Sequence, residues 1–331
     1  MASSRSASGR MSRRLLWLTV ALVVLTLLYT GGWFYAANRL AEATRAALGD
    51  LSQGGNRAVC ESATVRGFPF RIGVYCDATY VERGALGAAV STGPLRSAAQ
   101  VFSPKLVVAE ADSPARLSLP GLVPLDVEWQ GLHASARLAR PLPERVSIEA
   151  DGVKAVADMP NVDGPTAFSA RRLEFHLRPS GPDLDIATRF DALQPGALLI
   201  KNAEMPPISG LLDLTVKQGI ERLRTRKGEL RGTDVAVHQL EIRSPDGAAV
   251  TATGTISIGE DGLIDAELTL GASEPAALAQ TLSQAFPAQA DRITSVFAGL
   301  AALGENPSLP VTVNDGQAYL GFVRIGQIPP L

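Results

Sequence analysis

The sequence predicts a mainly β protein, with an N-terminal transmembrane helix followed by an elongated, curved antiparallel β-sheet and a helical insertion near residues 274–303. Three observations support this fold class. Residues 15–37 form one apolar run without a charge. Apolar and polar residues alternate with period two in many segments after residue 70. Only 5% of the 331 residues are aromatic, which leaves little bulk to fill a closed core.

The N-terminus has the pattern of a membrane anchor. Residues 1–14 carry four arginines and no acidic residue, and the next 23 residues are uncharged. At 1.5 Å per residue, residues 15–37 span roughly the 30 Å hydrocarbon core of a bilayer. The positive-inside rule then places residues 1–14 in the cytoplasm. We therefore expect a single-pass protein of the inner (cytoplasmic) membrane that contacts its lipids through this span, with the main domain in the periplasm.

A cleaved signal peptide is the alternative for this region. Signal peptides have apolar cores of 7–15 residues, shorter than this run, and residues 35–38 (YAAN) match a cleavage site poorly.

Residues 38–49 continue with helical periodicity. Leu40, Ala43, Ala47 and Leu48 recur on one side, and Gly49 ends the pattern. This segment is either a helix on the membrane surface or a continuation of the anchor. Residues 50–331 then form the exported β-rich domain. Proline-rich breaks are spread evenly through it, with a weak internal boundary near residue 160.

Cys60 and Cys76 are the only cysteines, and both lie in the exported part. An oxidising compartment favours their pairing. Their midpoint is Phe68, inside a segment with turn-forming Gly67 and Pro69, so a hairpin would set them opposite each other. Polar residues share a face with Cys60 whereas apolar residues share one with Cys76, so a twisted, bulged or shifted hairpin is the alternative. We expect a structural disulfide. A redox-active pair is the alternative, but the spacing is not C-x-x-C and no Lys or His lies nearby.

These cysteines also belong to a recognisable pattern. Cys60, the GFPFR segment at residues 67–71 and Cys76 are followed near the C-terminus by NDG at 314–316, LG at 320–321 and GQIPP at 326–330. The chain resembles a bacterial family described as domain of unknown function 2125. This resemblance implies an envelope protein of alphaproteobacterial type, and it transfers no catalytic or binding residue.

The alternating segments predict an antiparallel meander with one apolar face. Turn-forming Asp-Gly pairs at 151–152, 246–247, 261–262 and 315–316 separate them. Six residues of two such segments are candidates to line an apolar groove: Leu173, Phe175, Leu177, Leu212, Leu214 and Val216. The insertion carries helical apolar stripes on both sides of Pro287, and we expect these helices to pack on the apolar face. The pattern allows an open groove or a closed core, and the scarcity of aromatic residues favours a partly open groove.

The sequence contains no pattern typical of catalysis. Beyond residue 14 the chain has 27 basic and 33 acidic residues, a charge of −6, which is unfavourable for binding nucleic acid. The three histidines are 43 and 62 residues apart, and no nucleophile elbow, P-loop or dinucleotide motif is present. We therefore predict no catalytic residue, no metal and no cofactor.

Three functions remain open. The first is a membrane-anchored cell-envelope protein that binds or transfers a lipid or other apolar ligand in a β groove. The second is a structural or interaction scaffold of the inner membrane, with an envelope protein as its partner. The third is a hydrolase whose active site has no recognisable motif.

Overall fold

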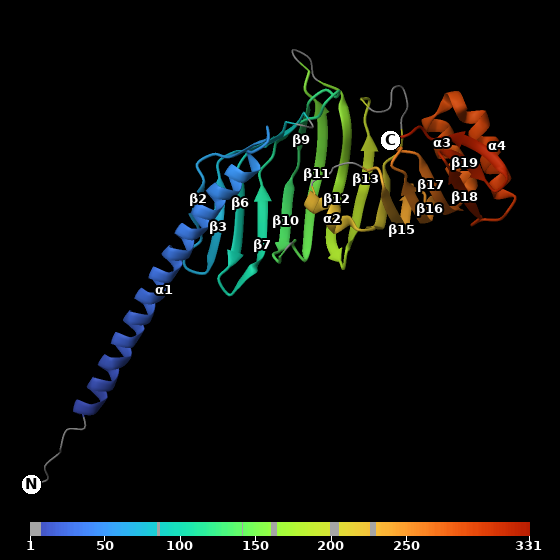
Figure 1. The fold of residues 1–331 in the computed structure, drawn as a ribbon. Coiled ribbons are helices and arrows are strands. Elements are labelled where there is room, and N and C mark those ends of the chain that lie inside the picture. The colour runs from blue at the N-terminus through green and yellow to red at the C-terminus, as the bar shows by residue number, and fades with distance from the viewer. Residues whose placement is uncertain (1–7, 85–86, 141, 160–163, 199–204, 226–229) are drawn as a thin grey trace, which may run out of the picture.

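A computed structural model describes residues 8–84, 87–140, 142–159, 164–198, 205–225 and 230–331 (Figure 1). Helix α1 (Ser8–Leu51) projects from one end of a long sheet. Its part from Arg13 onward is long and apolar enough to cross a membrane, and its most apolar window has a mean hydropathy of 2.0. α1 covers residues 15–37 and 38–49 without a break, so residues 38–49 continue the apolar helix. The weak boundary near residue 160 falls at 160–163, outside the described residues.

The C-terminal half of α1 packs against the first strands through one stripe of residues. Trp33 and Ala37 are buried, and the same stripe continues through half-buried side chains of Thr30, Leu40, Ala41, Thr44 and Leu48. The sequence pattern placed Ala43 and Ala47 in this stripe, but both are exposed. The reason is that Trp33 sets the rotation of the helix, because it is the large side chain that the strands enclose.

The remaining elements follow in chain order. The strands before the longest ladder are β1 (Arg57–Cys60), β2 (Thr64–Arg66), β3 (Arg71–Cys76), β4 (Thr79–Arg83), β5 (Ala88–Thr92), β6 (Leu95–Gln100), β7 (Ser103–Ala111), β8 (Ala115–Ser118), β9 (Leu125–Glu128) and β10 (Gly131–Arg137). The later elements are β11 (Arg145–Ala157), β12 (Thr166–Ser180), β13 (Asp183–Pro195), β14 (Ile208–Val216), α2 (Gly219–Thr225), β15 (Thr233–Arg243), β16 (Ala249–Ile258), β17 (Ile264–Ser273), α3 (Pro275–Ala285), the 3₁₀ turn η1 (Pro287–Gln289), α4 (Ala290–Ala301), β18 (Ser308–Asn314), β19 (Gln317–Leu320) and β20 (Val323–Gln327).

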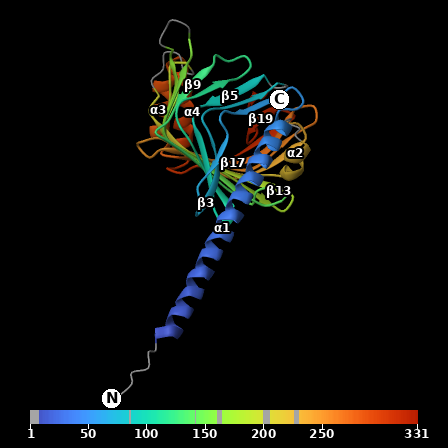
Figure 2. The same cartoon turned by 90° about the vertical axis from the view of Figure 1, so that its left-hand side faces the viewer.

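The sheet is a sequential antiparallel meander. From β11 to β20 each strand pairs with the next one in the chain. Before β11, the short strands follow one another in pairs, such as β3 with β4 and β5 with β6, and the two members of each pair are the halves of one bent strand. β3 pairs with β6 while β4 pairs with β5, and the register runs on across the bend, with Cys76 opposite Leu95 and Thr79 opposite Thr92. Seen from the end that carries α1, the sheet is a curved layer (Figure 2). The predicted mainly β fold with an open antiparallel sheet is therefore confirmed.

The Asp-Gly turns are confirmed at three of the four predicted positions. Residues 246–247, 261–262 and 315–316 join β15 to β16, β16 to β17 and β18 to β19. The prediction at Asp151-Gly152 is wrong, because both residues lie inside β11. Gly152 has φ of +61°, and it sits where β11 changes neighbour from β10 to β9. The glycine therefore permits a bend in the strand, which the sequence alone does not distinguish from a reversal.

The sheet is one layer for most of its length, so it encloses little core. The buried side chains are mainly alanines, and among the described residues no large side chain is less than 2% exposed. The total accessible surface is 21410 Å². A compact protein of this mass would expose only about 13,000 Å². The projecting α1 and the single-layer sheet both contribute to this excess.

Candidate functional site

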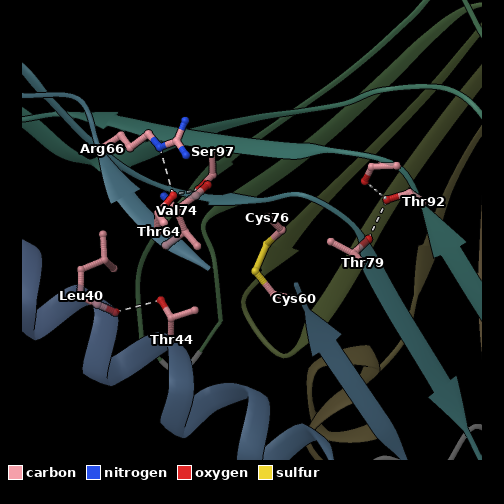
Figure 3. The surroundings of a disulfide bond; sticks show 11 residues. Leu40, Thr44, Cys60, Thr64, Arg66, Val74, Cys76, Thr79, Thr92 and Ser97 are labelled. Atoms are coloured by element: carbon pink, nitrogen blue, oxygen red, sulfur yellow. Dashed lines mark hydrogen bonds between the residues drawn. A yellow bond between two sulfur atoms is a disulfide. The ribbon is translucent and has the colours of Figure 1, made fainter. Parts of the chain in front are cut away.

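The disulfide joins the ends of two strands at the bend of the sheet (Figure 3). Cys60 ends β1, Cys76 ends β3, and their Cα atoms are 5.2 Å apart. The predicted bond is present, but the two cysteines are not direct cross-strand partners. Cys60 is opposite Thr79, and Thr64 is opposite Tyr75. The hairpin is centred between residues 69 and 70 rather than at Phe68, so the bond crosses the bend diagonally.

The turn of this hairpin is attached to α1. Tyr29 donates its hydroxyl hydrogen to the carbonyl oxygen of Pro69 at 2.5 Å, and Trp33 Nε1 donates to the carbonyl oxygen of Arg71 at 3.0 Å. The rings of Trp33 and Phe68 meet edge to face with centroids 5.4 Å apart. Two hydrogen bonds and this aromatic contact therefore fix the first hairpin against the C-terminal half of α1.

The six predicted groove residues lie together on one face of β12 and β14. Leu177 and Leu214 are both opposite Ile186 of the intervening β13. The other four also face residues of β13. Phe175 and Leu212 are both opposite Thr188. Leu173 is opposite Phe190, and Val216 is opposite Leu184. The six side chains are only partly buried, and Phe175 is 36% exposed.

The row through Leu177 continues along almost the whole sheet. Direct cross-strand partners connect Ile72, Ala99, Val107, Ala136, Val146, Leu177, Ile186, Leu214, Val237, Gly254, Leu268, Val311 and Leu320. Every member is apolar or glycine. We call this series the apolar row. Sequence reasoning missed its part before β11, because small residues such as Ala99 and Ala136 give a weak alternating signal.

The apolar row ends under the helical insertion. A cavity of about 880 Å³ lies between α4 and the last strands. The sheet contributes Leu270, Leu309, Val311 and Leu320 to its wall, and the helical segment contributes Phe286, Ile293, Val296, Phe297 and Leu300. The helices thus stand over the apolar face with open space beneath them. Two exposed arginines, Arg292 and Arg324, also line the cavity. It therefore combines an apolar wall with two cationic groups.

The opposite face of the sheet is polar and holds a second, smaller cavity of about 490 Å³. Its lining includes His176 and His238, which the sequence left unconnected. Thr215 Oγ1 lies 2.8 Å from both Asp185 Oδ1 and His238 Nε2. A hydrogen bond from Arg178 and a second from Thr215 lower the pKa of Asp185.

This polar cluster does not have the geometry of a nucleophile and its base. An ionised Asp185 can only accept a hydrogen bond, so the hydroxyl hydrogen of Thr215 points to the carboxylate. Thr215 Oγ1 then accepts from His238 rather than donating to it. A hydrolytic nucleophile needs the reverse arrangement, in which the histidine takes the hydroxyl proton. Within the described ranges, no group of three or more His, Cys, Asp and Glu side chains has the arrangement of a metal site.

Fold and surface together define a class of protein: a single apolar helix joined to an open antiparallel sheet that is apolar on one face and polar on the other. The sequence profile described as "Uncharacterized protein conserved in bacteria (DUF2125)" matches residues 33–329. The chain belongs to this family, as its resemblance indicated. No curated protein sequence matches the chain.

Proposed function

We propose that this is a membrane-anchored cell-envelope protein that binds or transfers a lipid or another apolar ligand along the apolar face of its sheet. The observation that carries the proposal is the partial exposure of large apolar side chains in the middle of the sheet. Ile148 is 38% exposed, its cross-strand partner Phe175 is 36% exposed, and Ile242 is 37% exposed. Covering such surface with apolar chains is favourable by about 25 cal/mol per Å².

The length of the apolar row supports a ligand with long chains, or several ligands in series. The row crosses from β3 to β19 through thirteen strands. At about 4.8 Å between neighbouring strands, it is roughly 58 Å long. The hydrocarbon core of a whole bilayer is only about 30 Å thick. The row is therefore long enough to guide an apolar chain away from a membrane surface.

Two features support a periplasmic location for the sheet. The arginines before the span favour a cytoplasmic N-terminus. The Cys60–Cys76 bond is typical of an oxidising compartment. Together they favour an inner-membrane protein whose sheet is in the periplasm.

Photo-crosslinking of the full-length protein in cells tests this proposal. Benzoylphenylalanine replaces Phe175 on the apolar face or, as the matched control, its neighbour His176 on the polar face. Lipid adducts, identified by mass spectrometry, are expected at position 175 and absent at 176. Equal labelling at both positions, or no lipid adduct at 175, would count against lipid handling.

An interaction scaffold is the second candidate, and the edge strand β20 favours it. All five residues of β20 are exposed, with Val323 at 65% and Ile325 at 56%, and Phe322 just before the strand is fully exposed. An exposed apolar edge can pair with a strand of another protein. Protein adducts at position 175, with no lipid, would support this function instead.

A further inference from the structure

The depth of the first hairpin relative to the membrane follows from its contacts with α1. The uncharged run at residues 15–37 is slightly longer than the about 20 residues that a span needs, and 20 residues counted from Leu15 end at Phe34. The ring of Phe34 stacks on Phe68 with centroids 6.1 Å apart. Tyr29, which binds the carbonyl oxygen of Pro69, is five residues earlier, or about 7 Å deeper along the helix. The turn at residues 67–70 therefore contacts the last part of the span, from Tyr29 to Phe34.

A second turn lies beside the first. The backbone N–H of Val101, in the turn between β6 and β7, donates to the carbonyl oxygen of Phe70 at 3.0 Å. Both turns present large aromatic side chains to the surroundings: Phe68 is 48% exposed, Phe70 is 64% and Phe102 is 78%. Phenylalanine is one of the residues typical of apolar surfaces that are buried at the boundary between lipid headgroups and acyl chains.

The charges around the two turns suit lipid headgroups. Residues 66–71 and 101–106 contain Arg66, Arg71 and Lys105 and no acidic residue, although acidic residues outnumber basic ones in the exported part. All three cationic side chains are exposed. A basic residue near an anionic membrane surface contributes about 1 kcal/mol of attraction. Cations flanking exposed phenylalanines are typical of a surface that inserts rings and binds phosphates.

The geometry points to a second membrane contact: residues 67–70 and 101–102 insert their phenylalanines into the headgroup region of the bilayer that α1 crosses. This contact attaches the sheet to the membrane at its first strands. Ile72, where the apolar row begins, is two residues from Phe70. If the row handles lipid, as proposed above, its first member lies at the membrane surface and its far end lies under α3 and α4.

Depth-dependent quenching in the full-length protein tests this contact. The two native cysteines are bonded, so Phe102→Cys introduces the one free thiol, which takes a bimane label. The matched control is Leu122→Cys, because Leu122 is 63% exposed and lies in the turn between β8 and β9. That turn follows β8, and therefore lies at the opposite end of the bent strand that β7 and β8 form. Both proteins are reconstituted into nanodiscs of phosphatidylcholine and phosphatidylglycerol, with and without lipid carrying a nitroxide near its headgroup.

We expect the nitroxide lipid to reduce bimane emission at position 102 at least twofold and to leave position 122 almost unchanged. Emission at position 102 that is no more quenched than at position 122 would overturn the membrane contact. The outcome is separable from lipid handling. Quenching at 102 without lipid adducts at Phe175 keeps the contact and removes the proposed function, and adducts without quenching do the opposite.

Discussion

Removing the disulfide should destabilise the sheet measurably without abolishing its fold. The Cys60→Ser/Cys76→Ser double variant opens a loop of 16 residues. The loss of loop-closure entropy in the unfolded chain gives an expected cost of about 3 kcal/mol. For about 280 residues beyond α1, an unfolding entropy of about 2.1 cal/mol/K per residue gives roughly 0.6 kcal/mol/K. The thermal midpoint should therefore fall by about 5 °C.

Intrinsic fluorescence during heating of the detergent-solubilised full-length protein measures this shift. Trp129 is a suitable reporter, because its indole N–H donates to the carbonyl oxygen of Ala111, next to the bend. Wild-type protein reduced with dithiothreitol is the control and should melt with the double variant. If both melt at the oxidised wild-type temperature, the bond does not constrain the unfolded chain and the argument from loop closure is wrong.

Three further predictions follow from burial, charge and topology. The Phe175→Asp variant should melt cooperatively near the wild-type temperature, because Phe175 is 36% exposed and a carboxylate there stays hydrated. The Ala155→Asp variant should unfold the protein, because Ala155 is 0% exposed and the carboxylate would lose its hydration. An equal loss of stability in the two variants would favour a closed core. Hydrogen bonds from Arg178 and Thr215 lower the pKa of Asp185, so its contribution to stability is present above about pH 4 and is lost as the pH falls through the lowered folded-state pKa. Asp185→Asn should accordingly flatten the decline of the thermal midpoint below about pH 4, and an unchanged decline would exclude this carboxylate as its source. Alkaline phosphatase fused after residue 60 should be active, since the arginines before the span favour a periplasmic sheet; an inactive fusion would reverse the orientation.

Local patterns were sufficient to predict that the six candidate residues share one face of the sheet. Leu173, Phe175 and Leu177 alternate with charged neighbours, and in a pleated strand alternate side chains share a face. Their counterparts on β14 follow the same rule. The early part of the apolar row could not be predicted, because small residues such as Ala99 become part of an apolar surface only through the strands beside them.

The register of the first hairpin shows a different limit. Two cysteines and a Gly-Pro turn predict a closed hairpin, but the sequence midpoint misplaces its centre by more than one residue. Strand pairing on both sides decides the register, and this pairing depends on segments such as β4 and β6, which are further along the chain. The same holds for Gly152, whose positive φ is compatible with a reversal and with a bend.

The sequence by itself determined the apolar helix, the antiparallel strands with one apolar face, the helical insertion and the pairing of the cysteines. Each of these depends on interactions between residues close in the chain, or on there being only two cysteines. Only the tertiary structure decided the bend through the first strands, the attachment of the hairpin at residues 67–70 to α1, and the cavity beneath α4. These features depend on contacts between segments that are distant in the chain, such as the hydrogen bond from Tyr29 to Pro69. Many weak contacts of this kind stabilise them together, and such contacts produce no periodic pattern in the sequence.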